Sequence, residues 1–152
     1  MKKFATLMAF AIIIATSSLH SAQALELKVN MREAKMNLSN KFTVQVLNWY
    51  GKLKDSEDEN ENVGESFGNC IFTDQDNQEC SQTMHITQGS MTGDLFLTFS
   101  DSNSNTASSF DAAITGGTDG FANAVGFAVV TPIDLDTGHY DYDINYNILS
   151  SS

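Results

Sequence analysis

Strict alternation of apolar and polar residues near the end of the chain constrains its fold more than any other feature. Residues 139–148 read HYDYDINYNI, in which every second residue is tyrosine or isoleucine. A β-strand places successive side chains on opposite faces, so this pattern predicts one buried face and one solvent-exposed face. The segment therefore predicts a strand of an antiparallel sheet with a single apolar side.

Similar alternating segments recur along the chain, separated by runs rich in Ser, Thr, Asn, Asp and Gly. Helical spacing is hard to find, and the single proline falls at position 132. We expect seven or eight antiparallel strands, arranged as a sandwich or as a closed barrel, whose closure would remove exposed edges. The expected strands cover residues 25–31, 41–50, 69–73, 79–88, 94–100, 109–115, 124–134 and 139–148.

The first 24 residues predict a cleaved secretory signal rather than part of the fold. Lys2 and Lys3 precede an apolar run from Phe4 to Ala15, and the small-residue pattern SAQA ends at Ala24. The apolar run is too short to span a bilayer comfortably, and its charged start looks bacterial. We expect residues 25–152 to form a single barrel domain that is secreted or periplasmic, with no membrane insertion after cleavage.

The chain is strongly acidic. Its formal net charge is −11, and loss of the two signal lysines leaves six basic against nineteen acidic residues, a net charge of −13. Such a chain lacks the Lys and Arg surface that neutralises phosphates, so nucleic acid is excluded as a partner. Residues 55–61 are almost wholly acidic or Asn and predict an exposed loop, with a calcium site as the alternative.

Cys70 and Cys80 lie almost symmetrically about a predicted turn at residues 74–78. In a hairpin the two residues would be opposite each other, within disulfide reach, on the apolar face. An even pair of cysteines in an exported chain suggests one disulfide.

Two histidines lie outside the predicted signal. His85 alternates with threonines on a polar face, whereas His139 precedes Asp141 and Asp143, which share one face. A metal site is conceivable there, but solvated strand residues are the simpler interpretation. We therefore predict no metal and no cofactor.

Residues 113–125, AITGGTDGFANAV, contain three glycines within five residues. Phosphate-binding loops need either a Gly-Lys pair or a G-x-G-x-x-G pattern that opens a helix. Here the pattern is G-G-x-x-G and a strand follows it, so the glycines predict a tight strand-to-strand corner. The glycines assigned to this structural turn are Gly116, Gly117, Gly120 and Gly126.

The longer segment AAITGGTDGFANAVGFAVV resembles the signature of the allene oxide cyclase and dirigent-like barrels. Upstream, VGESFGNC resembles a segment of secreted bacterial relatives, and the resemblance covers about residues 41–148. It implies an all-β fold, a closed eight-stranded antiparallel β-barrel with an apolar lumen. It also implies chemistry without a cofactor and, because plant members form trimers, a dimer or trimer as candidate assemblies.

Positions that carry chemistry in these families differ in this chain. Dirigent proteins have an Arg where this chain has Val125, and cyclases hold a water with a Pro and an Asn near the places of Val44 and Leu47. A first-strand Glu that polarises the cyclase substrate corresponds to Glu26 or Glu33, which are the two candidates for a catalytic residue.

Aromatic residues are the candidates for ligand contacts, with simple core filling as the alternative. They are Trp49, Phe72, Phe99, Tyr140 and Tyr142. We expect a secreted barrel that binds a small hydrophobic molecule or acts as an exported interaction factor. The alternative is a cyclase or isomerase, without a cofactor, for an oxylipin- or polyketide-like substrate. A lumen solidly packed with side chains would exclude both ligand hypotheses and indicate a role of the outer surface in adhesion or host interaction.

Overall fold

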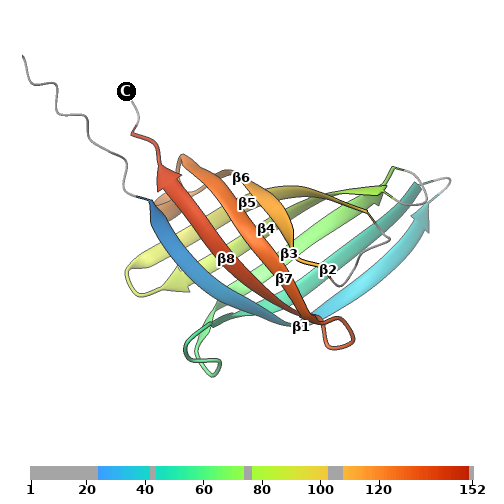
Figure 1. Cartoon of the computed structure of the whole chain (residues 1–152), viewed down its shortest axis with the longest axis horizontal. Coiled ribbons are helices and arrows are strands. Elements are labelled where there is room, and N and C mark those ends of the chain that lie inside the picture. Colours follow the sequence, from blue (N-terminus) through green and yellow to red (C-terminus); the bar gives the residue numbers. More distant parts are fainter. Residues whose placement is uncertain (1–23, 42–43, 74–76, 103–107, 151–152) are drawn as a thin grey trace, which may run out of the picture.

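The computed structural model describes residues 24–41, 44–73, 77–102 and 108–150. Each of its eight strands pairs antiparallel with its neighbours in sequence, and the last pairs with the first to close a barrel (Figure 1). This confirms the predicted closed barrel over the sandwich. The strands are β1 (Leu25–Lys41), β2 (Val44–Asp55), β3 (Asn62–Phe72), β4 (Asn77–Gln88), β5 (Met91–Ser102), β6 (Phe110–Gly117), β7 (Ala124–Asp134) and β8 (His139–Ile148).

The two largest errors in the predicted strand boundaries concern the end of β1 and the start of β3. β1 does not end at residue 31, because a register shift between Arg32 and Lys35 lets it continue its pairing with β2 as far as Lys41. β3 begins at Asn62 rather than at residue 69, because its polar start conceals an inward face that includes the buried Val63.

The inward faces of the strands form one contiguous core inside the barrel. On β8, Tyr142, Ile144 and Tyr146 are buried while the residues between them are half-exposed, as the alternation predicted. Burial of each large apolar side chain stabilises the fold by about 1.5–3 kcal/mol. Fully buried side chains from six strands fill its centre: Val29, Leu53, Val63, Met84, Ile86, Leu95, Leu97 and Ile144.

One end of the barrel is plugged by the connection between β6 and β7. A short 3-10 helix, η1 (Asp119–Phe121), buries Phe121 against Tyr146, with ring centroids 5.7 Å apart. The backbone N–H of Thr118 donates to the carbonyl of Asp94 at 2.9 Å and so ties this corner to β5. A Cβ at Gly117 would lie 2.5 Å from the same carbonyl oxygen, so the close approach requires glycine.

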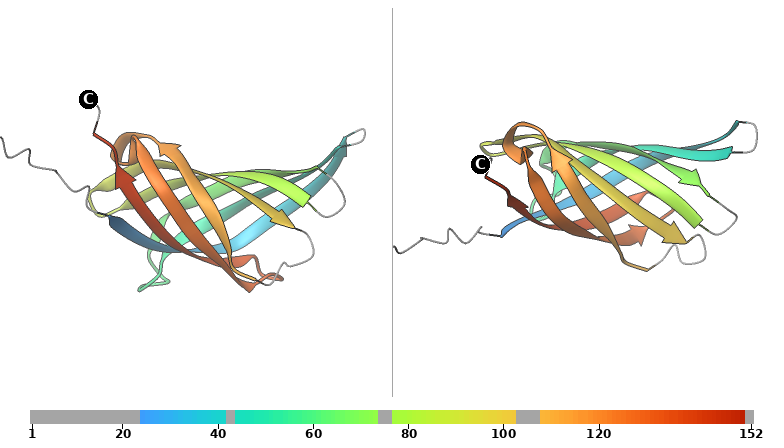
Figure 2. Two further views of the ribbon diagram at one scale, coloured as in Figure 1. Left: turned by 45° about the horizontal axis from the view of Figure 1, so that its top comes forward. Right: turned by 90° about the horizontal axis from the view of Figure 1, so that it is seen from above.

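The other end is an oblique mouth, because the strands reach it unequally. β1 pairs with β8 only as far as Met31 but with β2 as far as Lys41. Likewise β5 continues to Ser102, although its pairing with β6 stops at Thr98. The β1–β2 hairpin therefore extends past the turn between β7 and β8 (Figure 2). The described chain contains no helix long and apolar enough to cross a membrane.

Candidate ligand site at the open end of the barrel

Three aromatic side chains from different strands form a continuous surface at the mouth. The ring centroids of Trp49 and Phe99 are 6.2 Å apart, and those of Phe99 and Phe110 are 5.0 Å apart. Trp49 lies on β2 and Phe99 on β5, so the indole must reach across β3. Gly68 of β3 makes room for it, since a Cβ there would lie 2.3 Å from Cζ2 of Trp49. We call these three residues the aromatic surface.

A disulfide lies beside the aromatic surface. Cys70 and Cys80 are direct register partners on β3 and β4, with Cα atoms 4.0 Å apart, and the predicted bond between them is confirmed. Both face the barrel interior, in one row with Leu47 and Phe99. Neither thiol is free for chemistry, and closure of so short a loop stabilises the fold by roughly 2–3 kcal/mol in the chain-entropy account.

A buried polar network crosses the lumen below this row. The Nε2 atom of Gln82, on β4, donates to Oγ of Ser66 at 2.8 Å and to the hydroxyl oxygen of Tyr142 at 3.0 Å. Burial raises the pKa of Tyr142 far above its usual value, so the phenol stays protonated at neutral pH. The network links β4 with its neighbour β3 and with β8 on the opposite wall.

Two nearly buried polar atoms close to the network have no hydrogen-bond partner among the described residues. They are Oε1 of Gln82 and Nε1 of Trp49. Gln82 as a whole residue is 3% exposed, and Trp49 is 9% exposed. Buried polar atoms are almost always paired, so unpaired ones call for an explanation such as a bound molecule. Sequence reasoning missed Gln82 and Ser66, although Gln82 shares the inward parity of Cys80 and Met84.

Comparison with family models and with curated proteins finds no match. Among solved structures, a pterocarpan synthase dirigent protein superposes with a TM-score of 0.70 over 95% of this chain and 100% of that chain, at 15% identity. The fold is that of a dirigent-like barrel. A pyocyanin demethylase (TM-score 0.58, 20% identity) covers 82% of this chain and 100% of its own. An exo-specific intermolecular Diels–Alderase, AbnU (TM-score 0.58, 14% identity), covers 82% of this chain and 96% of its own.

The dirigent-like barrel places the predicted ligand-contact residues on its inward faces. Trp49 and Phe99 belong to the aromatic surface, and Tyr142 belongs to the polar network. Tyr140 is half-buried against the core, and Phe72 lies half-buried beyond Cys70, on the same face of β3 at the rim. The structure thus gathers at the mouth residues that are far apart in the sequence.

Other positions singled out by the sequence lie elsewhere. Glu26 is exposed on the outer face of the barrel, where its carboxylate pairs with Lys28 at 3.0 Å. The side chains of Glu33 and Val44 lie outside the described part of the structure. Val125, the counterpart of the dirigent Arg, is 37% exposed and alternates with the buried Ala124, so its side chain faces away from the lumen.

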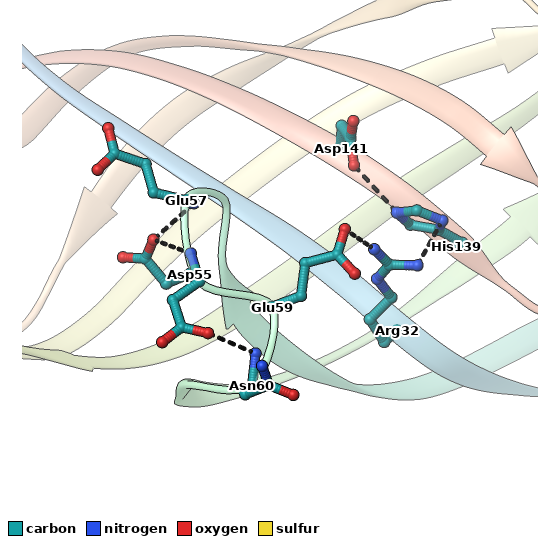
Figure 3. Close-up of polar contacts among 8 residues, drawn as sticks. Arg32, Asp55, Glu57, Glu59, Asn60, His139 and Asp141 are labelled. Atoms are coloured by element: carbon teal, nitrogen blue, oxygen red, sulfur yellow. Dashed lines mark hydrogen bonds and ion pairs between the residues drawn. The ribbon is translucent and has the colours of Figure 1, made fainter.

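The outer wall carries its own polar cluster, built around His139 (Figure 3). Arg32 contacts Nδ1 of His139 at 2.9 Å and pairs with Glu59 at 2.6 Å, while Nε2 of His139 contacts Asp141 at 3.1 Å. Because arginine can only donate, Nδ1 accepts and the Nε2–H donates to Asp141. The cluster fastens the acidic loop to the barrel wall through Glu59. The described residues contain no group of three or more residues suited to hold a metal ion.

An open groove of about 630 Å³ runs along the outside of the dirigent-like barrel over β3 to β7. It follows one row of register partners across these five strands. The row consists of Asn69, Ser81, Thr98, Ala113 and Phe127. Small side chains at the centre of the row leave a hollow, so the groove is a surface feature separate from the mouth.

Proposed function

We propose that this protein is an exported dirigent-like barrel that binds a small hydrophobic molecule at its mouth. The aromatic surface carries the proposal, because Phe99 and Phe110 stay half-exposed while the inward residues below them are fully buried. The predicted signal in residues 1–24 supports export, and a disulfide is the form that cysteines take in oxidising compartments.

The mouth favours an uncharged ligand. Among the inward-facing side chains that the structure describes, the polar ones at this end are amides, hydroxyls and an indole, and none is charged. Burial of a charged ligand group without a partner would cost several kcal/mol or more, so such ligands are disfavoured. A neutral molecule with a flat or branched apolar body matches the aromatic surface.

Trp49 is the only tryptophan of the chain, so its fluorescence reports directly on the mouth. Neutral terpenoids that do not absorb at the excitation wavelength should change its emission and saturate. Phe99→Ala should weaken binding about tenfold, because it removes one large contact. Phe67→Ala is the matched control, since Phe67 is exposed on the outer face. An emission that no ligand changes, or equal losses in both variants, would refute the proposal.

A cyclase or isomerase is the second candidate, favoured by the Tyr142 phenol inside the lumen. A protonated phenol held by Gln82 is placed to donate a hydrogen bond to a substrate oxygen, in chemistry that needs no cofactor. Two of the similar structures carry the names of a synthase and a Diels–Alderase. Turnover of an oxylipin- or polyketide-like substrate that Tyr142→Phe abolishes, with binding retained, would establish this candidate over simple binding.

The outer groove supports the other predicted role, that of an exported interaction factor. Ile71 and Phe127 expose large apolar side chains beside it. Sedimentation of the purified protein would test the predicted dimer or trimer, and native mass spectrometry of protein from its own host would report any retained small molecule.

A further inference from the structure

Trp49 and Gln82 present complementary unpaired atoms at the base of the mouth. The indole Nε1 carries a hydrogen to donate, whereas Oε1 of the amide can only accept. Both residues are more than nine-tenths buried, and neither atom has a partner among the residues described. One group that both donates and accepts would satisfy the two atoms together.

The strand register sets Trp49 and Gln82 in one inward row that crosses β2, β3 and β4. Trp49 is the register partner of Gly68, and Gly68 is the register partner of Gln82. A Cβ at Gly68 would lie 2.7 Å from Cε2 of Trp49, the ring atom bonded to Nε1. The nitrogen edge of the indole therefore lies over β3, about one strand spacing of 4.8 Å from the strand that carries Gln82.

The amide of Gln82 is held in a fixed orientation. Its Nε2 atom donates to Ser66 and to Tyr142, which accounts for both of its hydrogens. In this orientation Oε1 points away from Ser66 and Tyr142. A fixed acceptor discriminates between ligands better than a mobile one, because little ordering is needed on binding.

We infer that Trp49 and Gln82 together bind the hydroxyl group of a neutral hydrophobic alcohol or phenol. This inference rests on the proposed ligand-binding function and names its ligand class. The hydroxyl accepts from Nε1 of Trp49 and donates to Oε1 of Gln82, while the apolar body packs on Phe99 and Phe110. The ligand therefore lies with its hydroxyl inward and its hydrocarbon toward the open end.

Other polar groups satisfy this pair less well. A ketone or an ether accepts from the indole but leaves Oε1 of Gln82 unpaired. A carboxylate would set its negative charge against the same oxygen, and an ammonium group can only donate, so it would leave the indole N–H unpaired. A buried site built for a hydroxyl rejects analogues that lack it, because its own polar atoms are then left unpaired.

Three matched ligands test the inference on the unmodified protein: geraniol, its methyl ether, and the corresponding hydrocarbon 2,6-dimethyl-2,6-octadiene. Trp49 fluorescence and calorimetry should show geraniol binding about tenfold more tightly than either analogue. Equal affinity of geraniol and its ether would overturn the inference and leave the proposed function standing. Binding of none of the three would overturn both.

Two substitutions on β4 make the assignment specific. Gln82→Met removes the acceptor at similar volume, so geraniol should lose about tenfold in affinity and then bind no better than its ether. Thr83→Val is the matched control, because its side chain lies on the outer face of the same strand. A preference for geraniol that survives in Gln82→Met would overturn the inference, and the comparison of ligands on the unmodified protein stands even if this variant fails to fold.

Discussion

The hydroxyl of Tyr142 and the amide of Gln82 join opposite walls of the barrel through one hydrogen bond of 3.0 Å. The two residues lie sixty positions apart in the sequence, on β8 and β4. The bond fixes the amide that we assign to ligand recognition. The bond also crosses the lumen at a level between the packed core and the aromatic surface. The proposed ligand site therefore has a hydrogen-bonded polar layer directly beneath it.

Removal of the Tyr142 hydroxyl should destabilise the fold. Tyr142→Phe leaves one Nε2 hydrogen of Gln82 unpaired in a buried place, which we expect to cost about 1–2 kcal/mol in the free energy of unfolding. Tyr146→Phe is the matched control on the same face of β8, since its hydroxyl makes only a 3.5 Å contact to the sulfur of Met91. Urea unfolding of both variants measures the difference, and equal losses would contradict the proposed role of the bond.

The disulfide should contribute measurably to stability. Cys70→Ala combined with Cys80→Ala should lower the free energy of unfolding by roughly 2–3 kcal/mol, because the unfolded chain regains its loop entropy. Reductant should destabilise the wild-type protein toward the same value. Reductant should leave the stability of the double variant unchanged. Without reductant, a wild-type protein that is no more stable than the double variant would contradict the prediction.

Gly126 should not tolerate a side chain. Its φ is +153°, and a Cβ there would lie 2.1 Å from the carbonyl oxygen of Asn145 on the paired strand. Gly126→Ala should therefore prevent folding or cost more than about 3 kcal/mol, beyond the strain of the backbone alone. Gly89→Ala separates the two effects, because Gly89 has a φ of +60° but open space around it. We expect that control to cost about 1–2 kcal/mol by thermal or urea unfolding.

Asp55 should make stability depend on pH at the acidic end. Backbone N–H groups of Glu57 and Asp58 bond its carboxylate and lower its pKa in the folded protein. Its contribution is therefore present above the unfolded pKa of about 3.9 and is lost as the pH falls through the lowered value. Asp55→Asn should be less stable than wild type near neutral pH.

The gap between Asp55→Asn and the wild-type protein should narrow as the pH falls below the unfolded pKa of about 3.9 and through the lowered value. Urea midpoints measured across this range provide the test. Glu57→Gln is the matched control, because it removes one negative charge from the same loop. It keeps the hydrogen bond to Asp55, since the backbone N–H of Glu57 and not its carboxylate makes that bond. A gap that stays constant with pH would show that ionisation of Asp55 does not matter to folding.

Much of the fold could be predicted from local pattern. Alternation in residues 139–148 predicted which side chains of β8 are buried, and symmetry about a turn predicted that Cys70 and Cys80 face each other. The polar start of β3 escaped prediction, because Asn62, Gly64 and Glu65 read as a loop although Val63 and Ser66 are buried. Apolar–polar alternation does not predict inward positions that hold polar residues or glycine. For the same reason it did not identify Gln82 as an inward residue.

The sequence by itself determined the inward face of strands with strict alternation, such as β8, and placed a glycine corner between β6 and β7. Only the tertiary structure decided the neighbours, including closure of β1 on β8 and the placing of Trp49 beside Gly68 and Gln82. The physical reason is that a period of two is a local property of each backbone. The wall that a side chain meets across the lumen depends instead on the register of all eight strands at once.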